Sequence, residues 1–264
     1  MKHFASWFGS CLLVCLIACF ASGPLGAQDQ SATPPGAEKP AAAAHPKAAT
    51  HSGADSGLLH PETLKAKAPD VYEATFTTSK GDFVVQVTRS WAPNEADRFY
   101  NLVKHGYFDG VEFFRVVPGF VVQFGLTGSP AVNKAWENAN MKDDPVTQTN
   151  AEGTITFAQT GSPNSRSTQV FINLGNNAGL DHSGQGFAPF GQITSGMDVV
   201  KSLYSGYADA PTGHQDEITN QGNNYLQKNF PKLDGIKSAK ITSPAPAPAP
   251  SAAHKAPPAA PAPK

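Results

Sequence analysis

Arg115 is the one charged residue in the run Phe113–Gly125 (FFRVVPGFVVQFG). A cation among apolar side chains must be paired, or must lie at the edge of an apolar surface, because burying a lone charge is costly. Pro118-Gly119 divides the run into two short strands. The second strand carries Gln123, whose amide can hold a guanidinium in place. One fixed donor beside an apolar surface suits an apolar substrate with a single atom that needs a hydrogen bond.

Two further motifs follow in the sequence, TFAQTGSPNSRSTQVFIN (Thr156–Asn173) and GLDHSGQGFAPFGQI (Gly179–Ile193). Together with the Arg115 run, and in this order, they resemble the cyclophilin family of peptidyl-prolyl cis-trans isomerases over about Asp70–Ile241. The resemblance implies rotation of X-Pro bonds in proline-containing polypeptides, with no cofactor and no metal. We therefore expect an enzyme of the isomerase class.

The resemblance also assigns roles to individual residues. Arg115 would donate to the prolyl nitrogen in the transition state, and Gln123 would orient the substrate or the arginine. The alternative for Arg115 is a structural ion pair on a barrel surface. Five residues match the family's proline-pocket positions: Phe120, Val121, Phe171, Leu180 and Phe187. Ala158 and Gln159 match an edge that contacts an extended peptide, and Gln169 matches a polar neighbour of the pocket.

The alternation of side chains raises a difficulty for the pairing of Arg115 with Gln123. A strict two-residue hairpin at Pro118-Gly119 would pair Val117 with Phe120. Gln123 would then point away from the face that carries Arg115. Either the connection is wider or bulged, or Gln123 does not lie beside Arg115.

Three positions depart from the pattern of many eukaryotic cyclophilins. Gly179 stands at their tryptophan, Phe187 at their histidine and Val121 at their methionine. These changes keep an apolar surface but remove an indole donor and an imidazole. We predict weak binding of cyclosporin, which the family's tryptophan holds, and intact proline isomerisation.

The wider sequence predicts a mainly β domain. Val71–Thr78 and Asp82–Arg89 form a hairpin pattern, and Pro93–His105 has the signals of a helix. A second helix is predicted to start near Gly196, the long polar stretch Thr127–Glu152 holds a loop or short helix, and Glu217–Lys228 is a further helical candidate. Five later segments and a closing one are predicted to be strands: Val111–Val117, Phe120–Gly125, Thr154–Gln159, Thr168–Leu174, Phe187–Ile193 and, last, Ile236–Ile241. Eight short strands indicate a closed eight-stranded antiparallel barrel capped by two helices, as the resemblance also implies.

The ends of the chain differ in composition from this domain. Residues 1–27 have the pattern of a signal peptide cleaved after Ala27, with lipidation of Cys19 or an uncleaved anchor as alternatives. Residues 28–69 and 243–264, rich in Ala and Pro, are predicted to be a disordered linker and a disordered tail. The isomerase domain would span residues 70–242, and the protein would be exported to the periplasm or cell envelope, with a lipid anchor if Cys19 is acylated.

Charge and motifs exclude several other functions. The chain has 20 basic and 21 acidic residues and no basic stripe, so no nucleic-acid partner is expected. All three cysteines precede Phe20, which leaves the domain without disulfide or thiol chemistry. We expect a monomer. Two rivals remain, a non-catalytic module that binds proline peptides in the cell envelope and a structural envelope protein; the presence of Arg115 favours the enzyme.

Overall fold

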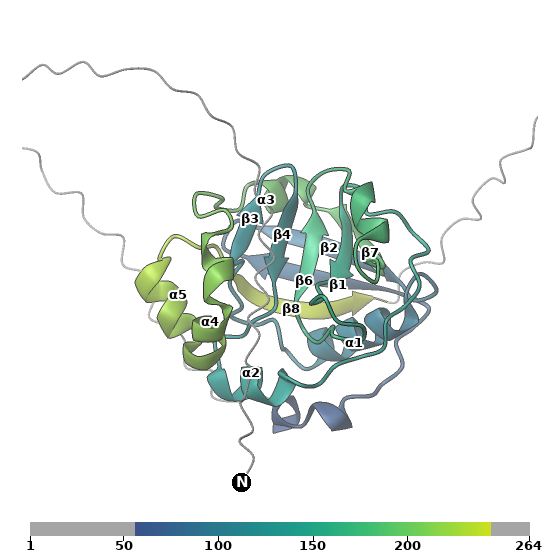
Figure 1. Ribbon diagram of the computed structural model, residues 1–264, viewed down its shortest axis with the longest axis horizontal. Helices are drawn as coiled ribbons and strands as arrows, with labels where there is room; N and C mark the ends of the chain where they lie inside the picture. Colours follow the sequence, from purple (N-terminus) through teal and green to yellow (C-terminus); the bar gives the residue numbers. More distant parts are fainter. Residues whose placement is uncertain (1–55, 244–264) are drawn as a thin grey trace, which may run out of the picture. The chain divides into compact units, whose positions relative to one another are not determined.

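The computed structural model of the chain describes residues 56–243 (Figure 1). Predictions for residues 1–55 and 244–264, which cover the signal peptide, Cys19, most of the linker and the tail, lie outside this part. The described residues form one antiparallel sheet in the order β3-β4-β6-β5-β7-β2-β1-β8. Its strands are β1 Val71–Thr78, β2 Asp82–Thr88, β3 Arg115–Val117, β4 Val121–Phe124, β5 Thr154–Phe157, β6 Val170–Asn173, β7 Gly191–Ser195 and β8 Ile236–Ser243. The predicted eight antiparallel strands are confirmed.

The sheet is a curled half-barrel that stays open, so the prediction of a closed barrel is wrong. The segments just before its edge strands β3 and β8 are joined, within residues 56–243, by an isolated antiparallel bridge from Glu112 to Gly235. Because the bridge is antiparallel, the residues of β3 after Glu112 lie opposite the residues before Gly235, whereas β8 starts after Gly235. The two edge strands therefore run away from each other on opposite sides of the bridge.

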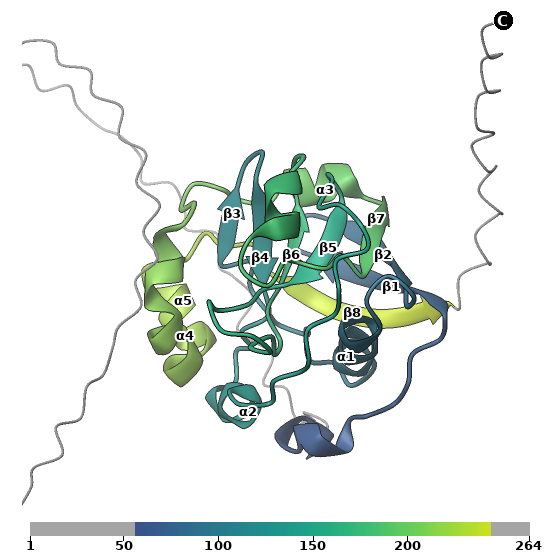
Figure 2. The same ribbon diagram turned by 45° about the vertical axis from the view of Figure 1, so that its right-hand side comes forward.

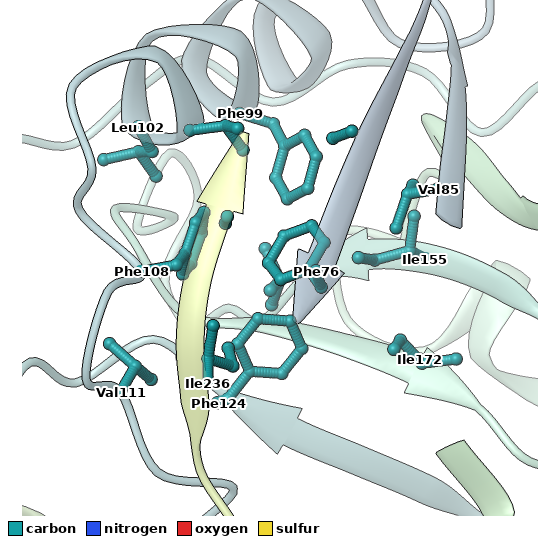
Figure 3. Close-up of a cluster of buried hydrophobic side chains, with 14 of the residues drawn as sticks. Phe76, Val85, Phe99, Leu102, Phe108, Val111, Phe124, Ile155, Ile172 and Ile236 are labelled. Carbon is teal, nitrogen blue, oxygen red and sulfur yellow. The ribbon is translucent and has the colours of Figure 1, made fainter. Parts of the chain in front are cut away.

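The hydrophobic core fills the concave side of the sheet. Strand β1 alternates between half-buried and buried positions along its whole length, as the period of two predicts. Figure 3 shows Phe76 of this strand between Phe99 and Phe124, with ring centroids 6.0 and 6.1 Å away. Phe83 stacks on Phe76 at 4.9 Å. These aromatic rings pack the core beneath the sheet that carries the predicted site.

Helix α1, Pro93–Lys104, follows the predicted range closely and covers the core with Phe99 and Leu102. The long polar stretch contains helix α2, Pro130–Trp136, and the helix near Gly196 is α3, Met197–Lys201. The candidate helix Glu217–Lys228 is divided into α4, Gln215–Gln221, and α5, Asn223–Asn229. Short 3₁₀ helices are η1 Ser56–Leu59, η2 Pro61–Thr63, η3 Ala178–His182 and η4 Ala210–His214. No helix within residues 56–243 is long and apolar enough to cross a membrane.

Helices α4 and α5 lie together beside α2, on the side of the molecule where β3 and β4 end the sheet (Figures 1 and 2). A second, smaller core attaches them. It consists of buried residues from the segment before β3, the segment after β4 and both helices: Phe114, Leu126, Ile218 and Leu226.

Residues 56–69 are ordered, which corrects the predicted extent of the disordered linker. Leu58 is buried, and its carbonyl oxygen accepts a hydrogen bond of 2.9 Å from the Trp136 indole. Asn101 donates to Ala66 and accepts from it, at 2.7 and 3.1 Å. Polar side chains of α1 and α2 thus satisfy the backbone of a segment whose own composition does not indicate order.

Candidate active site

The connection between β3 and β4 decides which side chains meet. Val117 pairs with Val121, so three residues rather than two form the turn. Phe120 N–H donates to the Val117 carbonyl at 3.0 Å, and Gly119 has a φ of +73°, as a type II turn requires at its third residue. In this register Arg115 lies directly opposite Gln123. The wider connection, one of the two alternatives left open above, is the correct one.

Three groups hold the Arg115 guanidinium. Its Nη1 donates to Gln123 Oε1 at 3.2 Å, and its Nε donates to Asp209 Oδ1 at 2.5 Å. Its central carbon lies 5.3 Å from the centre of the Phe120 ring, which favours a cation. Within residues 56–243 the Nη2 group makes no hydrogen bond, and the side chain is 25% exposed. Arg115 is therefore both an ion-pair partner and a fixed donor with a free nitrogen.

The predicted pocket residues of the strands share one face of the sheet. Gln123 pairs with Phe171 in β6, and Val121 lies two residues before Gln123. The intervening residues Val122 and Ile172 point into the core on the other face. Arg115, Val121, Gln123 and Phe171 therefore lie outside the core, on the convex face of the half-barrel.

The loop after β6 brings Leu180 and Phe187 to this face. The Phe187 ring packs edge-on against Phe171, with centroids 5.4 Å apart. Asn177 donates to the Phe120 carbonyl at 2.8 Å, and this bond attaches the loop to the β3–β4 turn. Leu180 lies in η3, and its carbonyl accepts from Phe187 N–H at 3.1 Å. Phe120 thus contacts Arg115, while Phe171 and Phe187 form an aromatic pair beyond Gln123 on the same side of the sheet.

Asn150 and Asp181 fix the same loop from its other side. Asn150 donates through its side chain to Asp181 at 2.7 Å and to the Phe187 carbonyl at 2.8 Å. Burial acts to raise the pKa of Asp181, but the hydrogen bonds from Asn150 outweigh it and hold this pKa below its usual value. The Asp181 carboxylate is therefore a structural acceptor in the loop.

The polar residues of the predicted site line a groove of about 440 Å³ beside the aromatic surface. Gln123, Ala158, Gln159 and Gln169 are among its walls. Gln159 donates to the Gly186 carbonyl at 3.2 Å, which fixes one wall to the loop that carries Phe187. The other predicted residues are not part of this groove, namely Arg115, Phe120, Val121, Phe171, Leu180 and Phe187. The predicted residues thus form two adjoining surfaces, one polar and one aromatic.

A buried ion network lies behind the site and was not predicted. Arg166 is fully buried; it pairs with Glu95 at 3.1 Å and also contacts Asp143 and the Gly186 carbonyl. Burial raises the pKa of Glu95, while Arg166 acts to lower it. One signal could have found the pair: Glu95 lies on the apolar stripe of α1, four residues before Phe99. The network ties helix α1 to the residue next to Phe187.

Asp209 is a second residue that sequence reasoning missed. It precedes η4 and lies 94 positions after the arginine that it contacts. No motif or periodicity surrounds it, so no pattern in the sequence could have joined the two.

The site thus combines a convex sheet face with a held guanidinium, an aromatic surface and a polar groove. A family model described as "Cyclophilin type peptidyl-prolyl cis-trans isomerase/CLD" matches residues 74–223. The chain therefore belongs to the cyclophilin-type peptidyl-prolyl cis-trans isomerase family, as its three motifs predicted.

Several characterised proteins are similar to the chain. Peptidyl-prolyl cis-trans isomerase A of Dickeya dadantii (strain 3937) is 35% identical over 129 residues, which are 48% of this chain and 68% of that protein. Peptidyl-prolyl cis-trans isomerase B of Escherichia coli (strain K12) is 32% identical over 148 residues, 54% of this chain and 90% of that protein. The crystal structure of Cryptosporidium parvum cyclophilin type peptidyl-prolyl cis-trans isomerase cgd2_1660 aligns with this chain at a TM-score of 0.49 and 19% identity. The aligned part is 66% of this chain and 98% of that protein's chain.

Proposed function

We propose that the chain accelerates cis-trans isomerisation of X-Pro bonds in proline-containing polypeptides, with Arg115 as the principal donor. The bond rotates over a barrier of roughly 18–20 kcal/mol and takes tens of seconds or longer without a catalyst. Reaching milliseconds requires a reduction of about 5.5–7 kcal/mol. When the amide twists it loses resonance, and its nitrogen gains a lone pair that can accept a hydrogen bond. A donor aimed at that nitrogen stabilises the transition state alone.

The observation that supports this most directly is the state of the Arg115 guanidinium. It is held from two sides by Gln123 and Asp209 and rests over Phe120, yet its Nη2 group makes no hydrogen bond within residues 56–243. A held arginine with a free terminal nitrogen can donate to substrate without first being ordered.

One charged hydrogen bond contributes roughly 1.5–3 kcal/mol, so the arginine cannot supply the whole effect. The aromatic surface of Phe120, Phe171 and Phe187 would supply more of it. An apolar surrounding disfavours the polar planar amide relative to the less polar twisted one. Gln123 would hold the Arg115 guanidinium in the orientation in which it can donate to the prolyl nitrogen.

The experiment is a protease-coupled assay on a proline peptide with wild-type protein and Arg115→Ala. We expect kcat/KM to fall by about 10- to 100-fold, which corresponds to the loss of one charged hydrogen bond. Arg89→Ala is the matched control, because Arg89 also pairs with an aspartate, Asp97, at 2.8 Å but lies outside the site. An unchanged rate in Arg115→Ala, with the fold intact by circular dichroism, would exclude the assigned role.

We further propose that the protein is exported and assists the folding of proteins in the periplasm or cell envelope. The apolar run Trp7–Phe20 and the small residues before Gln28 support a secretion signal. Mass spectrometry of the mature amino terminus tests this. A start at Gln28 indicates ordinary cleavage and a lipid-modified Cys19 indicates anchoring, while an intact Met1 contradicts export.

A further inference from the structure

Three glutamine side chains connect Arg115 to helix α4. Arg115 Nη1 donates to Gln123 Oε1 at 3.2 Å, and Gln123 Nε2 donates to Gln169 Oε1 at 2.9 Å. Gln169 Nε2 then donates to Gln215 Oε1, also at 2.9 Å. Gln215 is the first residue of α4 and lies outside the predicted site.

The segment 209–215 closes this chain of hydrogen bonds into a ring. Gln215 donates to the Thr212 carbonyl at 3.5 Å, and Thr212 N–H donates to the Asp209 carbonyl at 2.9 Å. The Asp209 carboxylate accepts from Arg115 Nε at 2.5 Å. Six residues from three distant parts of the chain thus form one closed circuit around the guanidinium.

The arginine determines the direction of the hydrogen bonds that run through the three glutamine amides. A guanidinium has donors and no acceptor, so Gln123 must present its oxygen to Arg115 and its NH₂ group to Gln169. The same argument passes along to Gln169 and Gln215, whose amides each accept on one side and donate on the other. Bonds aligned in this way polarise and strengthen one another.

Asp209 holds Arg115 without blocking it. The carboxylate occupies Nε, on the side of the guanidinium toward the chain, and leaves the terminal Nη2 nitrogen without a hydrogen bond to any described residue. A blocking contact would instead occupy the terminal nitrogens.

The segment 209–215 does not depend on the circuit for its own position. Ile218 and Leu226, in the helices that follow, are buried against Phe114 and Leu126 in the smaller core. Asp209 is 57% exposed. Removing its carboxylate or the Gln215 amide therefore leaves the docking of α4 and α5 intact.

We propose that Asp209 and Gln215 are positioning residues for the isomerase reaction, which hold Arg115 and the Gln123–Gln169 pair in the geometry that the substrate meets. This proposal rests on the proposed function. It means that the helical segment between β7 and β8 is part of the catalytic apparatus of this chain.

The test is a set of variants in the protease-coupled proline-peptide assay: Asp209→Ala, Asp209→Asn and Gln215→Ala, each alone and combined with Arg115→Ala. Asp209→Ala and Gln215→Ala should each lower kcat by about two- to fivefold, the range for a partly exposed ion pair or hydrogen bond, with a smaller change in KM. Asp209→Asn keeps an acceptor oxygen and should recover part of the loss. In the Arg115→Ala background these substitutions should have no further effect.

Glu217→Ala is the matched control, because Glu217 is an acid on α4 that pairs with His214 and does not touch the circuit. Its kcat should equal that of the wild type. Unchanged kcat in both Asp209→Ala and Gln215→Ala would overturn the inference, and so would equal losses with and without Arg115. A wild-type protein without isomerase activity would instead overturn the proposed function, so the two failures are distinguishable.

Discussion

At the scale of single residues, the site depends on the shape of one side chain more than on its charge. Arg115 uses two different nitrogens of a planar group, Nε toward Asp209 and Nη1 toward Gln123, and its third nitrogen makes no hydrogen bond in the described part of the chain. A lysine keeps the charge but has one ammonium group and no such fork. The geometry therefore requires arginine.

Arg115→Lys tests this requirement. We expect the variant to lose at least about tenfold in kcat/KM and to behave like Arg115→Ala, because it cannot donate to Gln123, Asp209 and substrate at once. The protease-coupled assay measures it, with thermal unfolding to show that the fold is kept. A variant that retains more than half of the wild-type rate would show that charge alone is sufficient.

Gly179 allows a second prediction at this scale. A Cβ atom added there would meet no heavy atom of residues 56–243 within 4 Å, so a side chain can start from this position without a clash at its first carbon. The wild-type protein should bind cyclosporin weakly. Gly179→Trp supplies the indole donor and should bind it about tenfold more tightly, the upper range for one added hydrogen bond, while isomerase activity is unchanged. Inhibition constants measure both, and Gly179→Leu, which lacks the donor, is the control; equal inhibition of all three proteins would contradict the prediction.

At the scale of elements, the sequence predicts the boundaries of strands and helices better than it predicts the register in which strands pair. The alternation in Val71–Thr78 and the capping pattern of Pro93–Lys104 gave both elements nearly to the residue. Pro118-Gly119 signalled a turn but not its width, because a type II turn can be followed directly by the strand or by one more residue, as here with Phe120. The face shared by Arg115 and Gln123 depends on that one residue. It could not be read from alternation.

The sequence predicts a helix in Glu217–Lys228 but does not predict its interruption. Gly222 ends α4 and caps α5 with φ 60° and ψ −145°, a conformation that side chains other than glycine rarely adopt. A Cβ atom at this position would also overlap the carbonyl oxygen of Gly128. The break therefore serves the docking of both helices onto the segment after β4.

Gly222→Ala should loosen this docking. We expect a loss of about 1–3 kcal/mol in the free energy of unfolding from the strained backbone alone, and a fall in isomerase rate because Asp209 and Gln215 move with the helices. Denaturant unfolding and the proline-peptide assay measure the two effects. Gly213→Ala is the control, since a Cβ there would meet nothing within 4 Å; equal stability of the two variants would contradict the account.

At the scale of the whole molecule, contacts between distant segments were the part that the sequence could not supply. Asp209 reaches Arg115, and Leu58 reaches Trp136, across 94 and 78 positions without any shared pattern. The predicted site residues came from the family resemblance, because the three motifs carry these positions at fixed places in the sequence. It gave no information on a helical segment that lies outside those motifs, nor on the order in residues 56–69.

The seam of the open sheet gives a prediction about the stability of the whole domain. Glu112 forms the bridge to Gly235 where the two sheet edges meet. Burial raises the pKa of its carboxyl group from 4.5 to about 7, although a hydrogen bond from Gln227 acts to lower it. At a pH between these two pKa values, the folded protein keeps a proton on Glu112 that the unfolded chain has released. Stability from this group is therefore present below about pH 4.5 and is lost as the pH rises through 7.

Glu112→Gln removes the ionisable group and should make the domain less sensitive to pH. The gain in unfolding free energy over the wild type should be about 2 kcal/mol larger at pH 8 than at pH 5, because the native carboxyl is charged at the higher pH and must then be held in a poorly solvated seam. Urea unfolding at the two pH values measures it. The exposed Glu137→Gln, whose carboxylate pairs with Lys134 and not with a histidine, should change stability equally at both pH values. The same behaviour in Glu112→Gln would mean that water reaches the seam and that the edges of the sheet are not joined there.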